Sequence, residues 1–306
     1  MDYYRVTPID DGVYRITSAE SVYMELLVGS EKAMLIDTGY GFSALKETIR
    51  KITDKPLYIV NTHGHCDHTC GNFQFDEEIY LAEADMDLMR RHNDPSYRAH
   101  SVELARHAID YATGLEFDSL PGDFDPDAYI NGIHTSYRPL KEGMTFSLGG
   151  KTLRAVAAPG HTKGSISFLY EERNWLYDGD AANIFLWLFG EDAADRTTYL
   201  NTLDKILAMA PDRIYGGHAD QPFTLQDVHM FKRTAIEADY EKGIPFSTPI
   251  LPECTDVRVC ILDGKTMKDI GTPGFYAILL DRKKGQKPLL SSPVFTEEFS
   301  VQNLSQ

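Results

Sequence analysis

Three histidines and one aspartate lie within six residues of this chain, in the run His63-Gly64-His65-Cys66-Asp67-His68. The run follows directly on an apolar stretch, residues 57–60, which predicts a buried strand that ends where the histidines begin. Imidazole nitrogens and carboxylate oxygens are ligands for zinc, iron and manganese. The fold must therefore bring the end of a strand to a metal site, and further ligands must come from elsewhere in the chain.

Three later segments supply candidate ligands, each next to a glycine and near a strand-like run: they carry His161, Asp180 and His218. Glycine permits the tight turns that hold such side chains at strand ends. A lone histidine is more often hydrogen-bonded than metal-bound, but here that explanation would have to apply to all five histidines of these motifs at once. The other five of the ten histidines are interpreted as solvated or core-edge residues: His92, His100, His107, His134 and His229. His134 is held open, since its segment is a candidate to fold over the site.

The order of these motifs resembles that of the metallo-β-lactamase superfamily. The matching segments are Asp37-Thr38-Gly39, the histidine run, Gly160-His161-Thr162, Gly179-Asp180 and Gly217-His218. The resemblance covers about residues 13–218. It implies an α/β fold, the αββα four-layer sandwich, with the metals at one edge between the two sheets.

The resemblance also implies a two-metal centre. His63, His65 and His161 would hold the first metal, Asp67, His68 and His218 the second, and Asp180 would bridge them. The implied cofactors are two divalent ions, zinc first, with iron or manganese as alternatives. Such a set leaves each metal a position for water, whereas structural zinc sites favour closed, cysteine-rich sets. Asp67 is the candidate catalytic residue that orients the water or moves its proton, and Asp37 is expected to fix the ligand turns.

The expected activity is hydrolysis of an ester-like carbonyl substrate, a thioester, lactone or ester, by a hydroxide bound to both metals. The motif pattern is most similar to the thioesterase and lactonase branches related to glyoxalase II. Two departures stand against a closer assignment. Lactonases of the superfamily often place a tyrosine where this chain has Asn183, and glyoxalase II carries a helical C-terminal domain where this chain has a predicted β-rich tail.

Other functions remain open. The main alternative is a redox enzyme, a persulfide dioxygenase with a single iron, which resembles the same motif. A β-lactamase, a phosphodiesterase and a non-catalytic metal-binding protein are further alternatives; Asp180 disfavours the β-lactamase, and His65 disfavours the flavodiiron oxidoreductases. The formal net charge of −16, from 46 acidic and 30 basic residues, disfavours a nucleic-acid partner and leaves a small-molecule substrate.

The predicted organisation is a hydrolase domain over residues 1–243, with an insertion at about 93–139, and a β-rich extension over 244–306 that packs on the same domain. Tyrosines of the insertion are expected to anchor it rather than to wall a pocket. The apolar run 183–189 is interpreted with equal weight as the lining of an apolar pocket or as a buried turn or interface segment. Helices are predicted at residues 43–52, 84–92, 101–112, 197–209 and 224–242.

Localisation follows from what the sequence lacks. The four cysteines include no Cys-x-x-Cys pair and do not resemble a disulfide framework, so a reducing compartment is expected. Cys66 is interpreted as a packing residue beside the ligands. The N-terminus does not resemble a signal peptide, and no apolar stretch approaches the ~18 residues of a membrane span. We expect a soluble cytoplasmic protein without a membrane partner, its oligomeric state left open.

Overall fold

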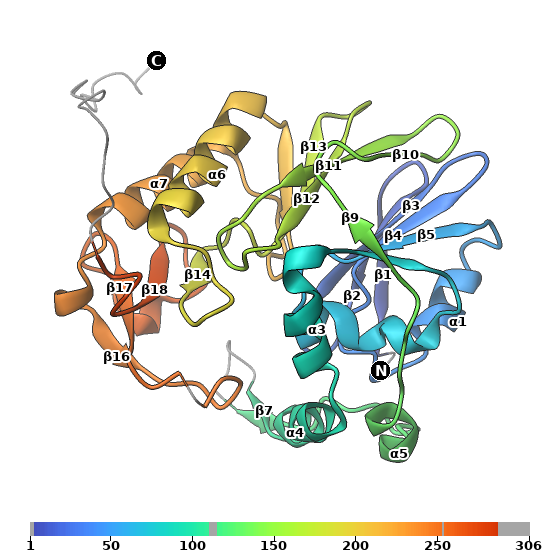
Figure 1. Ribbon diagram of the computed structural model, residues 1–306, viewed down its shortest axis with the longest axis horizontal. Helices are drawn as coiled ribbons and strands as arrows, with labels where there is room; N and C mark the ends of the chain where they lie inside the picture. Colours follow the sequence, from blue (N-terminus) through green and yellow to red (C-terminus); the bar gives the residue numbers. More distant parts are fainter. Residues whose placement is uncertain (1–2, 110–114, 253, 287–306) are drawn as a thin grey trace.

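The computed structural model describes residues 3–109, 115–252 and 254–286 of the 306. Its first sheet has seven strands in the order β1-β2-β3-β4-β5-β6-β9, antiparallel from β1 to β4 and parallel from β4 to β9 (Figure 1). The strands are β1 (Arg5–Asp10), β2 (Val13–Thr17), β3 (Tyr23–Val28), β4 (Ala33–Ile36), β5 (Leu57–Val60), β6 (Ile79–Ala82) and β9 (Tyr137–Leu140).

The second sheet has five strands in the order β10-β11-β12-β13-β15, and its last pair is parallel. The strands are β10 (Thr145–Ser147), β11 (Thr152–Ala157), β12 (Ile166–Tyr170), β13 (Trp175–Gly179) and β15 (Arg213–Gly216). Gly149 and Gly150 lie in the hairpin turn that joins the antiparallel strands β10 and β11. Every residue of β12 and β13 is buried, as expected for strands covered on both faces.

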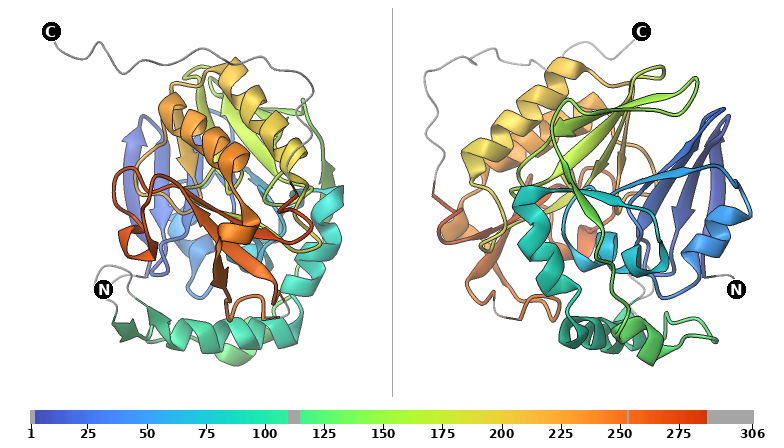
Figure 2. Two further views of the ribbon diagram at one scale, coloured as in Figure 1. Left: turned by 90° about the vertical axis from the view of Figure 1, so that its left-hand side faces the viewer. Right: turned by 45° about the vertical axis from the view of Figure 1, so that its right-hand side comes forward.

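Three apolar layers hold the sheets and helices together. Side chains of both sheets, among them Val60, Phe146 and Phe168, form the layer between the sheets. Helix α1 (Leu45–Arg50) buries Leu45 and Ile49 on the outer face of the first sheet. Helices α6 (Arg196–Met209) and α7 (Leu225–Glu237) cover the outer face of the second sheet. These layers confirm the expected αββα sandwich, which the two views of Figure 2 show from its sides.

The helix ends follow local chemistry. Asp195 accepts the backbone N–H of Thr198 at the start of α6, and Ala210, which caps the end of the helix, lies in the left-handed region just before Pro211. Thr224 and Asp227 form a reciprocal capping box at the start of α7. The predicted helix 224–242 is too long, since α7 ends at Glu237 and a short 3-10 turn, η3 (Tyr240–Lys242), follows.

The C-terminal extension shares a sheet with the hydrolase core. Strands β16 (Ile244–Phe246), β17 (Val257–Ile261) and β18 (Ala277–Asp281) form a four-stranded sheet with β14 (Phe185–Leu188), which comes from the apolar run after Asp180. Residues 185–188 of that run therefore form an interface strand and not a turn, because they pair in parallel with β18. Residues 287–306 of the predicted extension lie outside the described residues.

The insertion differs from its prediction at both ends. Its main helix, α4 (Pro95–Arg106), starts six residues before the predicted 101, because Asp94 caps it and Pro95 occupies its first turn. Its end is β9, which belongs to the first sheet. Between them lie β7 (Ala108–Ile109), β8 (Glu116–Phe117) and α5 (Pro126–Ile130); residues 110–112 of the predicted helix are outside the described residues.

The remaining short elements of the chain lie near the histidine run or in the tail. They are α2 (Cys66–Thr69), η1 (Cys70–Gln74), η2 (Glu83–Asp85), α3 (Met86–His92) and η4 (Met267–Asp269). Among the described residues, no helix combines the length and the apolarity that crossing a bilayer requires.

Candidate metal centre

The seven candidate ligands meet at one edge of the sandwich, where strands of both sheets end. The histidine run follows β5, His161 lies in the connection from β11 to β12, and Asp180 and His218 follow β13 and β15. Because β13 and β15 run in parallel, their carboxyl ends are neighbours, and Gly217 N–H donates to the Gly179 carbonyl at 2.7 Å. The sequence order of the motifs thus becomes a single site.

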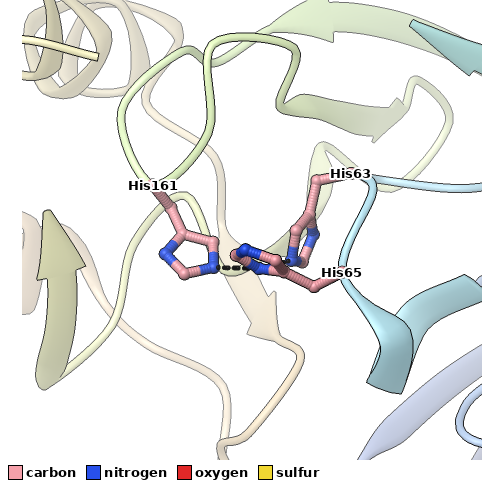
Figure 3. Close-up of side chains that lie close together, drawn as sticks. All are labelled: His63, His65 and His161. Carbon is pink, nitrogen blue, oxygen red and sulfur yellow. Dashed lines mark hydrogen bonds between the residues drawn. The ribbon is translucent and has the colours of Figure 1, made fainter. Parts of the chain in front are cut away.

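The first triad consists of His63, His65 and His161, whose rings converge (Figure 3). Nδ1 of His65 lies 3.0 Å from Nε2 of His63 and 2.9 Å from Nε2 of His161. The outer nitrogens of two rings are fixed: Nδ1 of His161 donates to the Trp187 carbonyl at 2.9 Å, and Nδ1 of His63 lies 3.1 Å from the Thr62 hydroxyl. Each of these bonds leaves the lone pair of Nε2 directed to the centre.

The second triad consists of Asp67, His68 and His218. Nε2 of His218 lies 3.1 Å from Oδ2 of Asp67, and Nε2 of His68 lies 3.6 Å from the same oxygen. Asp180 lies between the triads: its Oδ2 is 3.3 Å from Nε2 of His218 and 3.6 Å from Nε2 of His161, and its Oδ1 is 3.6 Å from Nε2 of His68.

Two observations fit a cation at this place. Nε2 of His68 and Oδ1 of Asp180 are buried without a hydrogen-bond partner, which is costly unless something else binds them. Gly217 leaves the necessary room, since a Cβ there would lie 2.7 Å from Oδ1 of Asp180 and 2.8 Å from Cε1 of His68. The donor set of imidazoles and carboxylates suits a divalent metal.

The two triads differ in charge. Burial, reinforced by neighbouring histidines, lowers the pKa of His63 and His65 well below the ordinary value, so these rings are neutral and ready to bind a metal. Burial also lowers the pKa of His68, but Asp67, Asp37 and Asp180 outweigh it and raise that pKa to about 9. A metal at the second triad must displace a proton from His68.

Asp37 fixes the second triad from behind. Its Oδ2 accepts Nδ1–H of His68 at 2.8 Å and the Thr62 hydroxyl at 2.8 Å, and its Oδ1 accepts the Thr62 backbone N–H at 2.7 Å. The first bond sets the tautomer that turns Nε2 of His68 to the centre. The predicted role of Asp37 in holding the ligand turns is supported by these three bonds.

Asp85, which the sequence analysis did not single out, ties two ligand loops together. Its Oδ2 accepts the Gly64 N–H at 2.9 Å and the Thr162 hydroxyl at 2.7 Å, and its Oδ1 accepts the Gly164 N–H at 2.8 Å. The available signal was its place just after the strand 79–82, at the same edge of the sheet as the histidine run.

Arg15 holds the loop of His218 and was also missed. Its guanidinium donates to the carbonyls of Gly216 and Ala219, each at 2.9 Å, and pairs with Glu25 at 2.8 Å. Arg15 and Glu25 face each other across the antiparallel strands β2 and β3. An arginine and a glutamate in two otherwise apolar strands were the sequence signal for a buried polar contact.

The histidines outside the motifs are not among the clusters that could hold a metal. His134 contacts the carbonyls of Phe75 and Ser136 at 3.1 and 2.8 Å, so it does not cover the site. His92 fits the core-edge interpretation: it is buried and stacks between His65 and Tyr97, with ring centroids 5.1 and 4.2 Å away.

Cys66 and Cys70 form no disulfide and are buried in the apolar cluster around Phe42 and Tyr129. Cys66 is therefore a packing residue, as expected. Tyr129 lies against the rings of Phe42 and Phe124, with centroids 4.9 and 5.6 Å away, so it anchors the insertion to the body.

Comparison with known proteins agrees with this geometry. A profile of the family described as the metallo-beta-lactamase superfamily matches residues 19–218. An acyl-coenzyme A thioesterase, MBLAC2 of Bos taurus, is 26% identical over 243 residues, which cover 71% of this chain and 82% of the relative. The atrochrysone carboxyl ACP thioesterase AgnL7 of Paecilomyces divaricatus is 29% identical over 188 residues, 60% of this chain and 45% of the relative.

Solved structures support the fold. A metallo-beta-lactamase from Pontibacter korlensis superposes with a TM-score of 0.53 at 16% identity and covers 76% of this chain and 99% of its own. The sec-alkylsulfatase Pisa1 from Pseudomonas sp. superposes with a TM-score of 0.57 at 13% identity, covering 76% of this chain and 41% of its own. The family match spans well over half of the sequence and contains every candidate ligand, so this chain is a hydrolase that belongs to the metallo-beta-lactamase superfamily.

Proposed function

We propose that this protein is a two-metal hydrolase that cleaves the carbonyl–sulfur bond of acyl thioesters. The observation that carries the proposal is the place of Asp180 between two triads. Its Oδ2 lies within 3.6 Å of Nε2 of His161 in the first triad and within 3.3 Å of Nε2 of His218 in the second. A carboxylate in this position suits a bridge between two ions.

The proposed ligands are those expected from the resemblance. His63, His65 and His161 hold one ion, Asp67, His68 and His218 hold the other, and Asp180 belongs to both. Bound divalent metals, with zinc the first candidate, supply a Lewis acid for the carbonyl and a water of lowered pKa. A set of seven side chains shared by two ions leaves room for water and substrate, which a closed structural site does not.

Asp67 is the proposed catalytic residue. Its side chain is 18% exposed, whereas those of His68 and Asp180 are 0% and 10% exposed, so it is the most accessible carboxylate of the centre. Burial raises its pKa, but His68 and His218 outweigh burial and hold that pKa well below the usual range. The ionised carboxylate is positioned to accept a hydrogen bond from a water and so to orient it.

The thioester class is proposed from the relatives. The acyl-coenzyme A thioesterase is 26% identical to this chain and the ACP thioesterase is 29% identical, and both are named as enzymes that act on thioesters. The net charge of −16 agrees with a small-molecule substrate rather than a nucleic acid. We also propose a hydrolase domain over residues 1–243, an extension from residue 244, and a cytoplasmic location.

The test is a hydrolysis panel on protein reconstituted separately with zinc, manganese and iron. The panel holds acyl thioesters, lactones, carboxyl esters, β-lactams and phosphodiesters. The proposal expects the highest kcat/KM for a thioester, and a loss of kcat in Asp67→Asn and His161→Ala without unfolding. His229→Ala, an exposed histidine on α7, is the matched control and should retain full activity. Activity on phosphodiesters alone contradicts the proposal.

A further inference from the structure

We infer that the half-buried aromatic face of the C-terminal sheet binds the acyl chain of the substrate, and that its residues Phe185, Trp187 and Phe246 set a preference for long apolar acyl groups. We call these three residues the aromatic platform. The inference rests on the proposed thioesterase function and extends it to the class of acyl group. The platform combines strands from both sides of the predicted domain boundary.

The alternation of β14 creates the platform. Leu186 and Leu188 point to the helices α6 and α7 and are buried in that core. Phe185 and Trp187 point to the opposite face and are only partly buried. The ring of Phe246 from β16 lies 6.0 Å from both, measured between centroids, so the three rings form one surface.

The platform adjoins the metal centre through Trp187. The carbonyl oxygen of Trp187 accepts Nδ1–H of His161 at 2.9 Å, so the residue that carries the indole ring also orients a candidate ligand. A substrate whose carbonyl carbon lies at the centre can extend its acyl chain along β14.

The insertion and the extension meet beyond the platform. The Tyr97 hydroxyl on α4 donates to the Ile250 carbonyl at 3.0 Å, and Nε2 of His100 lies 2.7 Å from the Pro249 carbonyl. Tyr97 also stacks on His92, which stacks on His65. Figure 1 shows the segment after β16 running to α4, below β14 and α3.

These contacts form a continuous series of neighbouring residues that starts and ends at the metal centre. It runs from His161 to Trp187, across the platform to Phe246, along the chain to Ile250, and through Tyr97 and His92 to His65. Leu251, next to Ile250, packs in the same apolar cluster as the platform. The platform therefore belongs to the surroundings of the metal centre.

The chemistry of the platform selects its ligand. The cluster behind it consists of apolar side chains from the extension, including Val257, Val259 and Leu279, and three aromatic rings lie on its surface. Such a surface gains free energy from burying methylene groups and offers little to a polar acyl group. The ligand that fits is a hydrocarbon acyl chain.

The first test compares acetyl, hexanoyl and decanoyl thioesters of coenzyme A on the zinc-loaded protein. The inference expects kcat/KM to rise about fourfold for each methylene group that the platform buries. Phe246→Ala should lower the ratio of decanoyl to acetyl kcat/KM by roughly tenfold or more. Ile236→Ala, which removes an exposed apolar side chain from α7, should keep the wild-type ratio.

The second test does not need turnover. The chain has two tryptophans, and Trp175 is buried in the layer between the sheets, so added decanoate should change the fluorescence of Trp187 alone. The change should be present in wild type and absent in Trp187→Phe, which keeps an aromatic ring on the platform.

The outcomes separate the two proposals. Thioester hydrolysis with a kcat/KM that does not depend on chain length overturns the platform and leaves the proposed function standing. A decanoate response of Trp187 without hydrolysis of any thioester supports the platform and overturns the proposed function. If neither signal is observed, both proposals are wrong.

Discussion

Replacing Asp37 with asparagine should weaken metal binding while the fold is retained. Asp37 has a φ of 63°, a left-handed conformation that asparagine also tolerates, so the backbone accepts the change. The amide has one oxygen and one NH2 group in place of two oxygens. Asp37 now accepts three donors, from Thr62 N–H, the Thr62 hydroxyl and Nδ1–H of His68.

The substitution changes which ring nitrogen of His68 carries the proton. If the amide NH2 group faces Nδ1 of His68, that nitrogen must become an acceptor and the proton moves to Nε2, the atom that faces Asp67 and Asp180 at 3.6 Å. If the amide turns over, its NH2 group opposes the Thr62 N–H instead. Loss of such a supporting partner lowers metal affinity about 10–100-fold, or about 1.4–2.7 kcal/mol of binding free energy.

The assay is a competitive zinc titration against a chelator of known affinity, on wild type and Asp37→Asn. Asp263→Asn is the matched control, because Asp263 is an exposed aspartate with a φ of 56° and lies far from the ligands in sequence. We expect weaker zinc binding in Asp37→Asn and wild-type zinc binding in Asp263→Asn. The loss should chiefly affect the ion that the second triad binds. Wild-type affinity for zinc in Asp37→Asn would refute the argument that the Asp37–His68 bond orients the ligand.

Three further predictions concern the surroundings of the centre. Asp85→Ala leaves the donors of Gly64, Thr162 and Gly164 without their acceptor, so the free energy of unfolding should fall by about 3 kcal/mol in urea titrations; an unchanged midpoint would contradict this. Gly217→Ala places a Cβ 2.7 Å from Asp180 and should lower the zinc content of the purified protein, whereas Gly122→Ala, with open space around it, should not. Burial, partly offset by Arg15, raises the pKa of Glu25 from 4.5 to about 7, so the folded state keeps a proton that the unfolded chain releases. Stability should therefore fall as pH rises from about 4.5 to 7, by up to about 3 kcal/mol relative to Glu25→Gln; parallel stability profiles of the two proteins would exclude it.

The candidate ligands could be picked out from the sequence because they lie in short segments that contain a glycine and follow a strand-like run. Four strand ends at one edge of two sheets then bring residues as distant as His63 and His218 together. The partners that hold the ligands were harder to predict. The bond from His161 to Trp187 uses a backbone carbonyl, and a carbonyl has no sequence signature.

The missed strands have a common physical cause. Residues 185–188 and 137–140 are short, and each strand pairs with a strand far away in sequence, β18 and β6. Local patterns describe a run of residues but not its partner. The apolar run after Asp180 was therefore interpreted as a pocket lining or as a buried turn or interface segment, and only its pairing with the extension identified it as a strand.

The central claim is a two-metal centre, and the metal content of the protein tests it most directly. Wild type and Asp180→Asn should be reconstituted with zinc, freed of loose metal, and analysed for metal per chain together with thioester hydrolysis. The account predicts two divalent ions per active wild-type chain, and a loss of both the second ion and the activity in Asp180→Asn. One iron per chain, with oxygen consumption and no thioester hydrolysis, would contradict it.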